Sequence, residues 1–298
     1  MTTRSGRLFG CGTALVTPFR ADGSVDEQAL RSLVEWQIAE GIHFLVPCGS
    51  TGEAVTLAPE EYRRVVEIVV DQTAGRVPVM AGAGSNDTRR AIANSREMCA
   101  AGATHLLHVS PMYNKPPQRG IVAHFRAIAE AVDLPIVIYN VPGRTGSNIE
   151  ARTSLELATV PGVVGVKEAS GNLGQIIDII RVRPPHFSVL SGDDALTFPV
   201  MMAGGDGIIS VVSNATPRAM VDLTERCDAG DLDGARGIHM RLTPWMQAAF
   251  IESNPIPVKA ALAMLGRIEN VLRLPLVPLL ESNASAVRES LVAAGAMA

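Results

Sequence analysis

The sequence lacks the segments that mark a membrane protein or a nucleic-acid-binding protein. No apolar run approaches the ~20 residues that a membrane-spanning helix needs. No basic stretch offers a footprint for phosphate groups, and the first ten residues contain no apolar core of a secretory signal. The four cysteines are scattered, with no CxxC pair and no zinc-binding spacing, which favours reduced thiols. We therefore expect a cytoplasmic protein with no membrane partner and no nucleic-acid partner.

Lysine is also scarce. The chain has 26 basic residues, but only Lys115, Lys167 and Lys259 are lysines. Arginine cannot supply a neutral amine near pH 7, so each lysine is considered separately as a nucleophile. Lys115 lies in a proline-rich loop and Lys259 on a late helix, so both are expected at the surface or, for Lys259, at an interface. Lys167 directly follows the apolar run 163–166, where burial would lower its pKa.

Short apolar runs alternate with longer amphipathic segments along most of the 298 residues. Eight runs are expected to form strands: residues 13–16, 44–47, 78–81, 105–109, 135–139, 163–166, 188–190 and 207–211. Helices are expected at residues 26–40, 59–72, 87–101, 118–131, 154–159, 172–183, 194–203 and 217–228. This alternation predicts an α/β fold, a parallel (β/α)8 TIM barrel over residues 1–230. A doubly wound open sheet is the alternative. Residues 231–298, with helices at 232–250, 257–265 and 284–294, are expected to form a C-terminal helical domain.

In such a barrel, reactive side chains are expected where strands end. Lys167 and Tyr139 end neighbouring strands. A neutral lysine amine adds to carbonyl groups to form a Schiff base, and a nearby tyrosine can act as its general acid/base. Tyr113 and the hydroxyls of Ser50 and Thr51 could extend a proton relay. The alternatives are an ion pair of the lysine with Glu168 or an Asp at the barrel rim, and a tyrosine that is simply part of the core.

Two features suit carboxylates. The turn at residues 49–52 exposes backbone N–H groups between two glycines, and such a concavity binds anions. Arg144 follows a proline and a glycine, and its planar guanidinium suits a second carboxylate or, alternatively, a surface ion pair.

Other chemistries have little support in the sequence. His105 and His108 have no third metal ligand at useful spacing, so we expect them to be strand and core residues. The sequence has no P-loop and no complete dinucleotide-binding glycine motif. We therefore predict no metal and no organic cofactor.

Several motifs occur in a recognisable order. These are GSTGE at residues 49–53, YNVPGRTG at 139–146 and GVKEASGNL at 165–173, followed by SGDD at 191–194 and NPIPVK at 254–259. Together they resemble the dihydrodipicolinate synthase / N-acetylneuraminate lyase family of class I aldolases, over nearly the whole chain. The resemblance implies a (β/α)8 barrel with a C-terminal helical domain, in a homotetramer built as a dimer of dimers.

The resemblance also implies a mechanism. Lys167 would form a Schiff base with pyruvate or another 2-oxo acid, and Tyr139 would be the general acid/base. Ser50 and Tyr113 would complete the proton relay, with Tyr113 reaching into the site of the adjoining subunit.

Further residues are implied for substrate binding. Backbone groups at Ser50 and Thr51 would hold the pyruvate carboxylate, with Ile209 lining the same pocket. Arg144 would receive the carboxylate of aspartate semialdehyde, and Gly192 would contribute backbone to the pocket. The favoured reaction condenses pyruvate with aspartate semialdehyde to 4-hydroxy-tetrahydrodipicolinate, in lysine and diaminopimelate biosynthesis. The alternatives are a pyruvate-releasing lyase or dehydratase of a sugar-derived 2-oxo acid and, in another class, a non-catalytic barrel that senses a keto acid.

Some positions depart from the family pattern. Ser50 stands where these synthases more often have threonine, and Met112 where many have an aromatic residue at the dimer interface. Lysine-inhibited members commonly carry an acidic residue at the position of Arg90 and a histidine at that of Tyr62, whereas Asn86 is retained. Because a cationic Arg90 would repel the lysine ammonium group, we predict weak or absent inhibition by lysine.

Overall fold

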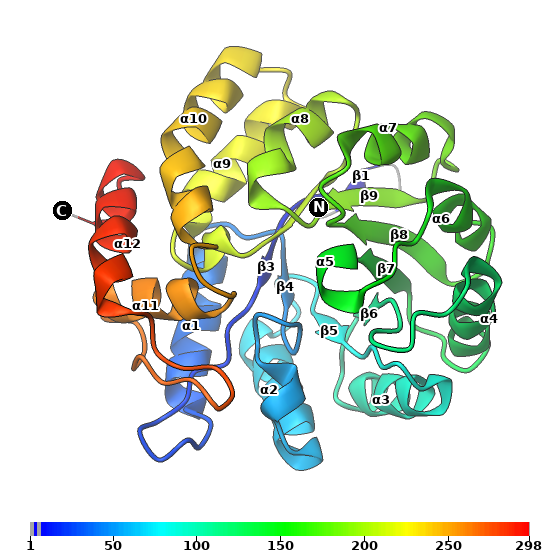
Figure 1. The fold of residues 1–298 in the computed structure, drawn as a ribbon, viewed down its shortest axis with the longest axis horizontal. Coiled ribbons are helices and arrows are strands. Elements are labelled where there is room, and N and C mark those ends of the chain that lie inside the picture. The colour runs from blue at the N-terminus through cyan, green and yellow to red at the C-terminus, as the bar shows by residue number, and fades with distance from the viewer. Residues whose placement is uncertain (1–2, 5–6, 298) are drawn as a thin grey trace.

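Eight parallel strands form a barrel in the computed structural model, which describes residues 3–4 and 7–297 (Figure 1). The strand order is β4-β3-β10-β9-β8-β7-β6-β5. Leu45 bridges Val79 and donates its backbone N–H to the Pro78 carbonyl at 3.0 Å, which joins the two edges of this sheet. The predicted fold class is therefore confirmed. The barrel strands are β3 (Gly10–Ala14), β4 (Phe44–Val46), β5 (Met80–Gly82), β6 (His105–Val109), β7 (Ile136–Asn140), β8 (Val163–Glu168), β9 (Ser188–Ser191) and β10 (Gly207–Ser210).

Helices follow the strands and, apart from the short α5 at the rim, cover the outside of the barrel (Figure 1). They are α1 (Glu27–Ala39), α2 (Pro59–Thr73), α3 (Thr88–Ala100), α4 (Gln118–Ala129), α5 (Pro142–Thr145), α6 (Ala151–Leu157), α7 (Leu173–Val182), α8 (Thr197–Met202) and α9 (Pro217–Asp228). Asp87 and Asn172 cap α3 and α7 by accepting backbone N–H groups. The sequence does not predict the short helix α5, the 3-10 turns η1 (Ala54–Thr56) and η3 (Val212–Asn214), or the hairpin of β1 (Thr3–Arg4) with β2 (Arg7–Leu8). The helix predicted at residues 194–203 begins as the 3-10 turn η2 (Asp194–Leu196) and continues as α8.

The alternation of side chains along each strand separates two cores. Outward residues such as Ile138 and Val166 pack under the helices. Inward residues such as Val137, Leu190 and Ile209 fill the barrel interior. The interior is therefore solid below the ends of the strands, and a site can open only at the rim.

Three further helices follow the barrel: α10 (Leu232–Ala248), α11 (Ile256–Met264) and α12 (Glu281–Ala293). Helix α10 lies beside α9, and α12 packs against α10 and α11 (Figure 1). The expectation of a surface or interface position for Lys259 is wrong, because its side chain on α11 is fully buried in an ion pair with Glu53. The domain boundary at residue 230 stays a prediction.

No helix in the described ranges is long and apolar enough to cross a membrane. The expectation that the first ten residues hold no secretory signal falls partly outside the described residues, since it also concerns Met1, Thr2, Ser5 and Gly6.

Candidate active site

Lys167 and Tyr139 lie side by side at the carboxyl ends of β8 and β7. The strand register pairs the two residues directly, and the Lys167 Nζ lies 4.4 Å from the centroid of the tyrosine ring. Both side chains point into the barrel and are 5% and 8% exposed, respectively. The residues before them, Ile138 and Val166, face outward, so strand alternation itself aims the amine and the phenol at one point.

Burial changes the acid–base properties of both groups. Desolvation lowers the pKa of Lys167 from 10.5 to about 8, with the nearby Arg144 acting in the same direction and Asp194 opposing it. Burial raises the pKa of Tyr139 to about 12, which makes its hydroxyl a weaker acid than that of a free tyrosine, and the group is protonated at neutral pH. With a pKa of about 8, roughly one Lys167 in ten is neutral at pH 7, against about one in 3,000 at the ordinary value.

Glu168 does not pair with Lys167. Being the next residue on β8, it faces away from the barrel interior and accepts hydrogen bonds from Asn140 Nδ2, Gln175 Nε2 and the Ser170 backbone N–H. Within the described part of the chain, no carboxylate lies within ion-pair distance of Lys167. The amine therefore has only a weakly stabilised charged form.

A cavity of about 1190 Å³ opens above this pair. It brings together most of the predicted site residues: Ser50, Thr51, Tyr139, Arg144, Lys167 and Gly192. Gly192 lies so near the lysine that a Cβ there would come within 3.0 Å of Lys167 Cε. Ile209 does not line the cavity; it is fully buried in the barrel interior, and Val211, two residues later, lines the cavity instead.

The loop after β4 presents backbone donors to this cavity. It turns sharply between Cys48 and Glu53, both of which adopt positive φ angles of 57° and 51°. The N–H groups of Ser50 and Thr51 donate to no other residue that the structure describes. Both residues line the cavity, and anion binding by their free amides stays a prediction.

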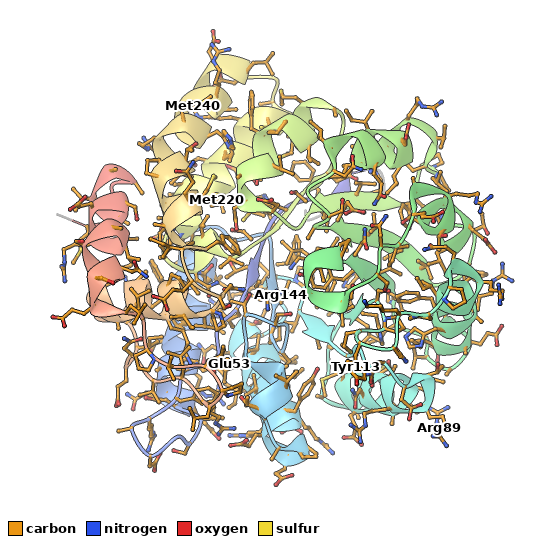
Figure 2. All side chains as sticks on the ribbon, in the orientation of Figure 1. Glu53, Arg89, Tyr113, Arg144, Met220 and Met240 are labelled. Atoms are coloured by element: carbon orange, nitrogen blue, oxygen red, sulfur yellow. The ribbon has the colours of Figure 1, made fainter. Side chains whose placement is uncertain are left out.

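Arg144 projects from α5 over the same cavity (Figure 2). Its Nη2 donates to the backbone carbonyl of Asn254 at 3.2 Å. No carboxylate among the described residues forms an ion pair with it, so the alternative of a surface ion pair is not supported. The guanidinium is therefore available to a substrate carboxylate.

Tyr113 is not brought to the cavity. Its side chain is 90% exposed, its φ is +72°, and it lies toward α3, apart from Arg144 (Figure 2). A side chain so exposed cannot relay protons within its own chain. Its role in the site of an adjoining subunit stays a prediction.

The cavity extends away from Lys167 toward α2 and α3. Tyr62 and Arg90 line this extension, and the Tyr62 hydroxyl donates to the Gly82 carbonyl at 2.7 Å. Asn86 lies outside it, exposed, and donates to the backbone carbonyl of Met112 at 3.2 Å. The prediction of weak lysine inhibition is untested by this geometry.

Two residues of the site had no assigned role in the sequence. Asn254 lines the cavity and hydrogen-bonds to Thr51, and Glu53 anchors the loop after β4 from below. Both residues belong to motifs of the sequence, GSTGE and NPIPVK, but nothing in the spacing of these motifs indicates a mutual contact. Among the described residues, no group of three or more His, Cys, Asp or Glu side chains is arranged to hold a metal.

The fold and the site define the class of protein: a (β/α)8-barrel enzyme with its site at the carboxyl ends of the strands. More particularly, the chain belongs to the Dihydrodipicolinate synthetase family, which it matches over residues 7–294.

Individual relatives match this chain over nearly its full length. The 4-hydroxy-tetrahydrodipicolinate synthase of Koribacter versatilis is 51% identical over 98% of this chain and 97% of its own length. The 4-hydroxy-tetrahydrodipicolinate synthase of Nitratidesulfovibrio vulgaris is 52% identical over 97% of this chain and 99% of its own length. Among solved structures, the chloride-inhibited dihydrodipicolinate synthase of Acinetobacter baumannii, complexed with pyruvate, matches with a TM-score of 0.95 and 41% identity, covering 97% of this chain and 99% of that one.

Proposed function

We propose that the chain is a lyase that condenses pyruvate with aspartate semialdehyde to 4-hydroxy-tetrahydrodipicolinate through a Schiff base on Lys167. The observation that carries the proposal is the buried Lys167 amine, with its pKa lowered to about 8, beside Tyr139 under a cavity with free carboxylate-binding groups. The activity named for relatives at 51% and 52% identity supports the same reaction. No metal or organic cofactor is required, because the lysine imine itself withdraws electrons from the reacting carbon.

The first half of the reaction forms the imine. The neutral Lys167 amine attacks the ketone carbon of pyruvate, giving a carbinolamine. The Tyr139 hydroxyl, which is protonated at neutral pH, donates a proton to the departing oxygen, and water leaves. The N–H groups of Ser50 and Thr51 bind the pyruvate carboxylate during these steps.

The second half forms the carbon–carbon bond. Loss of a methyl proton converts the imine to an enamine, whose carbon attacks the aldehyde of the semialdehyde held by Arg144. The substrate amino group then adds to the imine carbon, closing the ring and releasing Lys167. Ser50 and Tyr113, the latter from an adjoining subunit, carry the protons between Tyr139 and solvent. This arrangement requires an oligomer, and we propose a homotetramer acting in the cytoplasm in lysine and diaminopimelate biosynthesis.

Turnover of pyruvate with aspartate semialdehyde, coupled to a dihydrodipicolinate reductase and followed by NADPH loss, tests the proposal. Rapid turnover is expected, together with a borohydride-trapped pyruvate adduct on Lys167 that Lys167→Ala loses. An adduct without turnover would contradict the choice of aldehyde and favour a lyase or dehydratase of a sugar-derived 2-oxo acid. The absence of any adduct would refute the aldolase chemistry and favour a keto-acid sensor.

A further inference from the structure

The loop after β4 is held from below by the C-terminal part of the chain. The Glu53 carboxylate at its end is fully buried; it accepts a hydrogen bond from Lys259 Nζ at 2.6 Å through one oxygen and from the Arg273 backbone N–H at 3.0 Å through the other. Because these partners come from residues more than 200 positions away, the shape of the carboxylate-binding loop depends on the C-terminal helices.

Asn254, just before α11, contacts the middle of the same loop. Its Nδ2 donates to Thr51 Oγ1 at 2.9 Å. Both side chains line the cavity, yet they are only 6% and 3% exposed. Water therefore competes little for this hydrogen bond.

The direction of this bond determines what the Thr51 hydroxyl can do. An amide nitrogen can only donate, so the Thr51 oxygen accepts, and its own proton must point elsewhere. Among the described residues, no acceptor takes that proton. The O–H group is thus free to donate into the cavity, beside the free N–H groups of Ser50 and Thr51.

The other end of the Asn254 amide is unsatisfied. Its Oδ1 is buried and has no hydrogen-bond partner in the part of the chain described here. A buried acceptor without a donor costs folding free energy, so an amide at this position is a poor choice for stability alone. A cost of this kind is typical of residues that serve a site.

We propose that Asn254 is a positioning residue for the substrate: by occupying a lone pair of the Thr51 hydroxyl, it turns that hydroxyl into a hydrogen-bond donor for the carboxylate of the 2-oxo acid. This inference rests on the proposed function, since it assumes that a 2-oxo acid reacts with Lys167. Asn254 itself does not touch the reacting atoms.

The test titrates imine formation with pyruvate alone, trapped with borohydride and measured by intact mass. We expect Asn254→Ala to raise the half-saturating pyruvate concentration about tenfold, the effect of one charge-assisted hydrogen bond. The extent of labelling at saturating pyruvate should stay unchanged. Thr51→Val should give the same rise, and the double variant should be no worse than Thr51→Val, because both changes remove one interaction. Thr51→Ser, which keeps the hydroxyl, should retain most of the affinity.

Asn283→Ala is the matched control. Its Nδ2 donates to Glu252 Oε1 at 2.7 Å in the same C-terminal region, without contact to Thr51. We expect Asn283→Ala to leave the half-saturating pyruvate concentration unchanged. A general loosening of this region would instead raise that concentration in the control variant as well. If Asn254→Ala fails to fold, the nearly isosteric Asn254→Asp replaces it; its carboxylate cannot donate, so half-saturation should rise further.

Two results would overturn the proposal: half-saturation within twofold of the unaltered protein in the folded Asn254 variant, or additive effects in the double variant. Failure of the proposed function is distinguishable from these. Turnover with a different aldehyde would replace the second substrate but leave the pyruvate titration valid. The absence of a pyruvate adduct in the unaltered protein would refute both.

Discussion

Replacing Lys167 by methionine should abolish the chemistry and yet stabilise the protein. The side chain is 5% exposed, and no carboxylate among the described residues lies within ion-pair distance of it. Methionine has a similar length and no charge, so it can fill the same space without desolvation of an ammonium group. The catalytic amine is therefore expected to be retained at the expense of stability.

The size of the expected gain in stability follows from the pKa of Lys167. Its fall from 10.5 to about 8 corresponds to about 3 kcal/mol of unfavourable burial of the charged form. The contact of Nζ with the Tyr139 ring at 4.4 Å favours the cation and offsets about 1 kcal/mol of this. We therefore expect Lys167→Met to raise the free energy of unfolding at pH 7 by about 2 kcal/mol, or ~4 °C in a chain of this length.

The gain in stability from Lys167→Met depends on pH in a definite direction. Because the folded-state pKa is lowered, the unfolded chain binds more protons between about pH 8 and pH 10.5, and the stability of the unaltered protein rises with pH through that window. The gain from Lys167→Met should therefore shrink to about 1 kcal/mol at pH 10.

Thermal unfolding of both proteins at pH 7 and pH 10, at equal protein concentration, measures this difference. Lys115→Met, at an exposed lysine, is the control and should show no such pH-dependent gain. A lower melting temperature for Lys167→Met at pH 7, or an equal gain at both pH values, would refute the argument from desolvation.

Four further predictions concern activity and stability. Arg144→Ala should lower kcat/KM for aspartate semialdehyde by about 10²-fold, with the pyruvate adduct forming normally by mass spectrometry. Tyr139→Phe should lower kcat by about 10²–10⁴-fold in the coupled assay. Lysine should inhibit weakly or not at all because Arg90 repels its ammonium group; clear inhibition at sub-millimolar lysine would contradict this. Lys259→Met should lower the free energy of unfolding by about 3–5 kcal/mol in denaturant titrations, because Glu53 stays buried and unpaired; adding Glu53→Gln should recover part of the loss.

Local sequence patterns predicted the elements well where each element depends on its own residues. Strand β6 (His105–Val109) and helix α9 (Pro217–Asp228) begin and end where their patterns predict. The first barrel strand, at Gly10–Ala14, begins three residues and ends two residues earlier than expected, because its pairing with β10 sets its bounds. Pairing between strands is a tertiary property, and the apolar pattern of one strand does not identify the partner residues that fix where it begins and ends.

The sequence by itself determined the alternating elements and the placement of Lys167 and Tyr139 at neighbouring strand ends, because the side-chain period of a strand and the direction of a parallel sheet follow from local pattern. Only the tertiary structure decided that Lys259 is buried against Glu53, that Asn254 contacts Thr51, that Ile209 lies below the cavity and that Tyr113 points away from it. Burial and hydrogen bonding depend on partners that lie up to about 200 residues away along the chain, and no local pattern of residues encodes those distances.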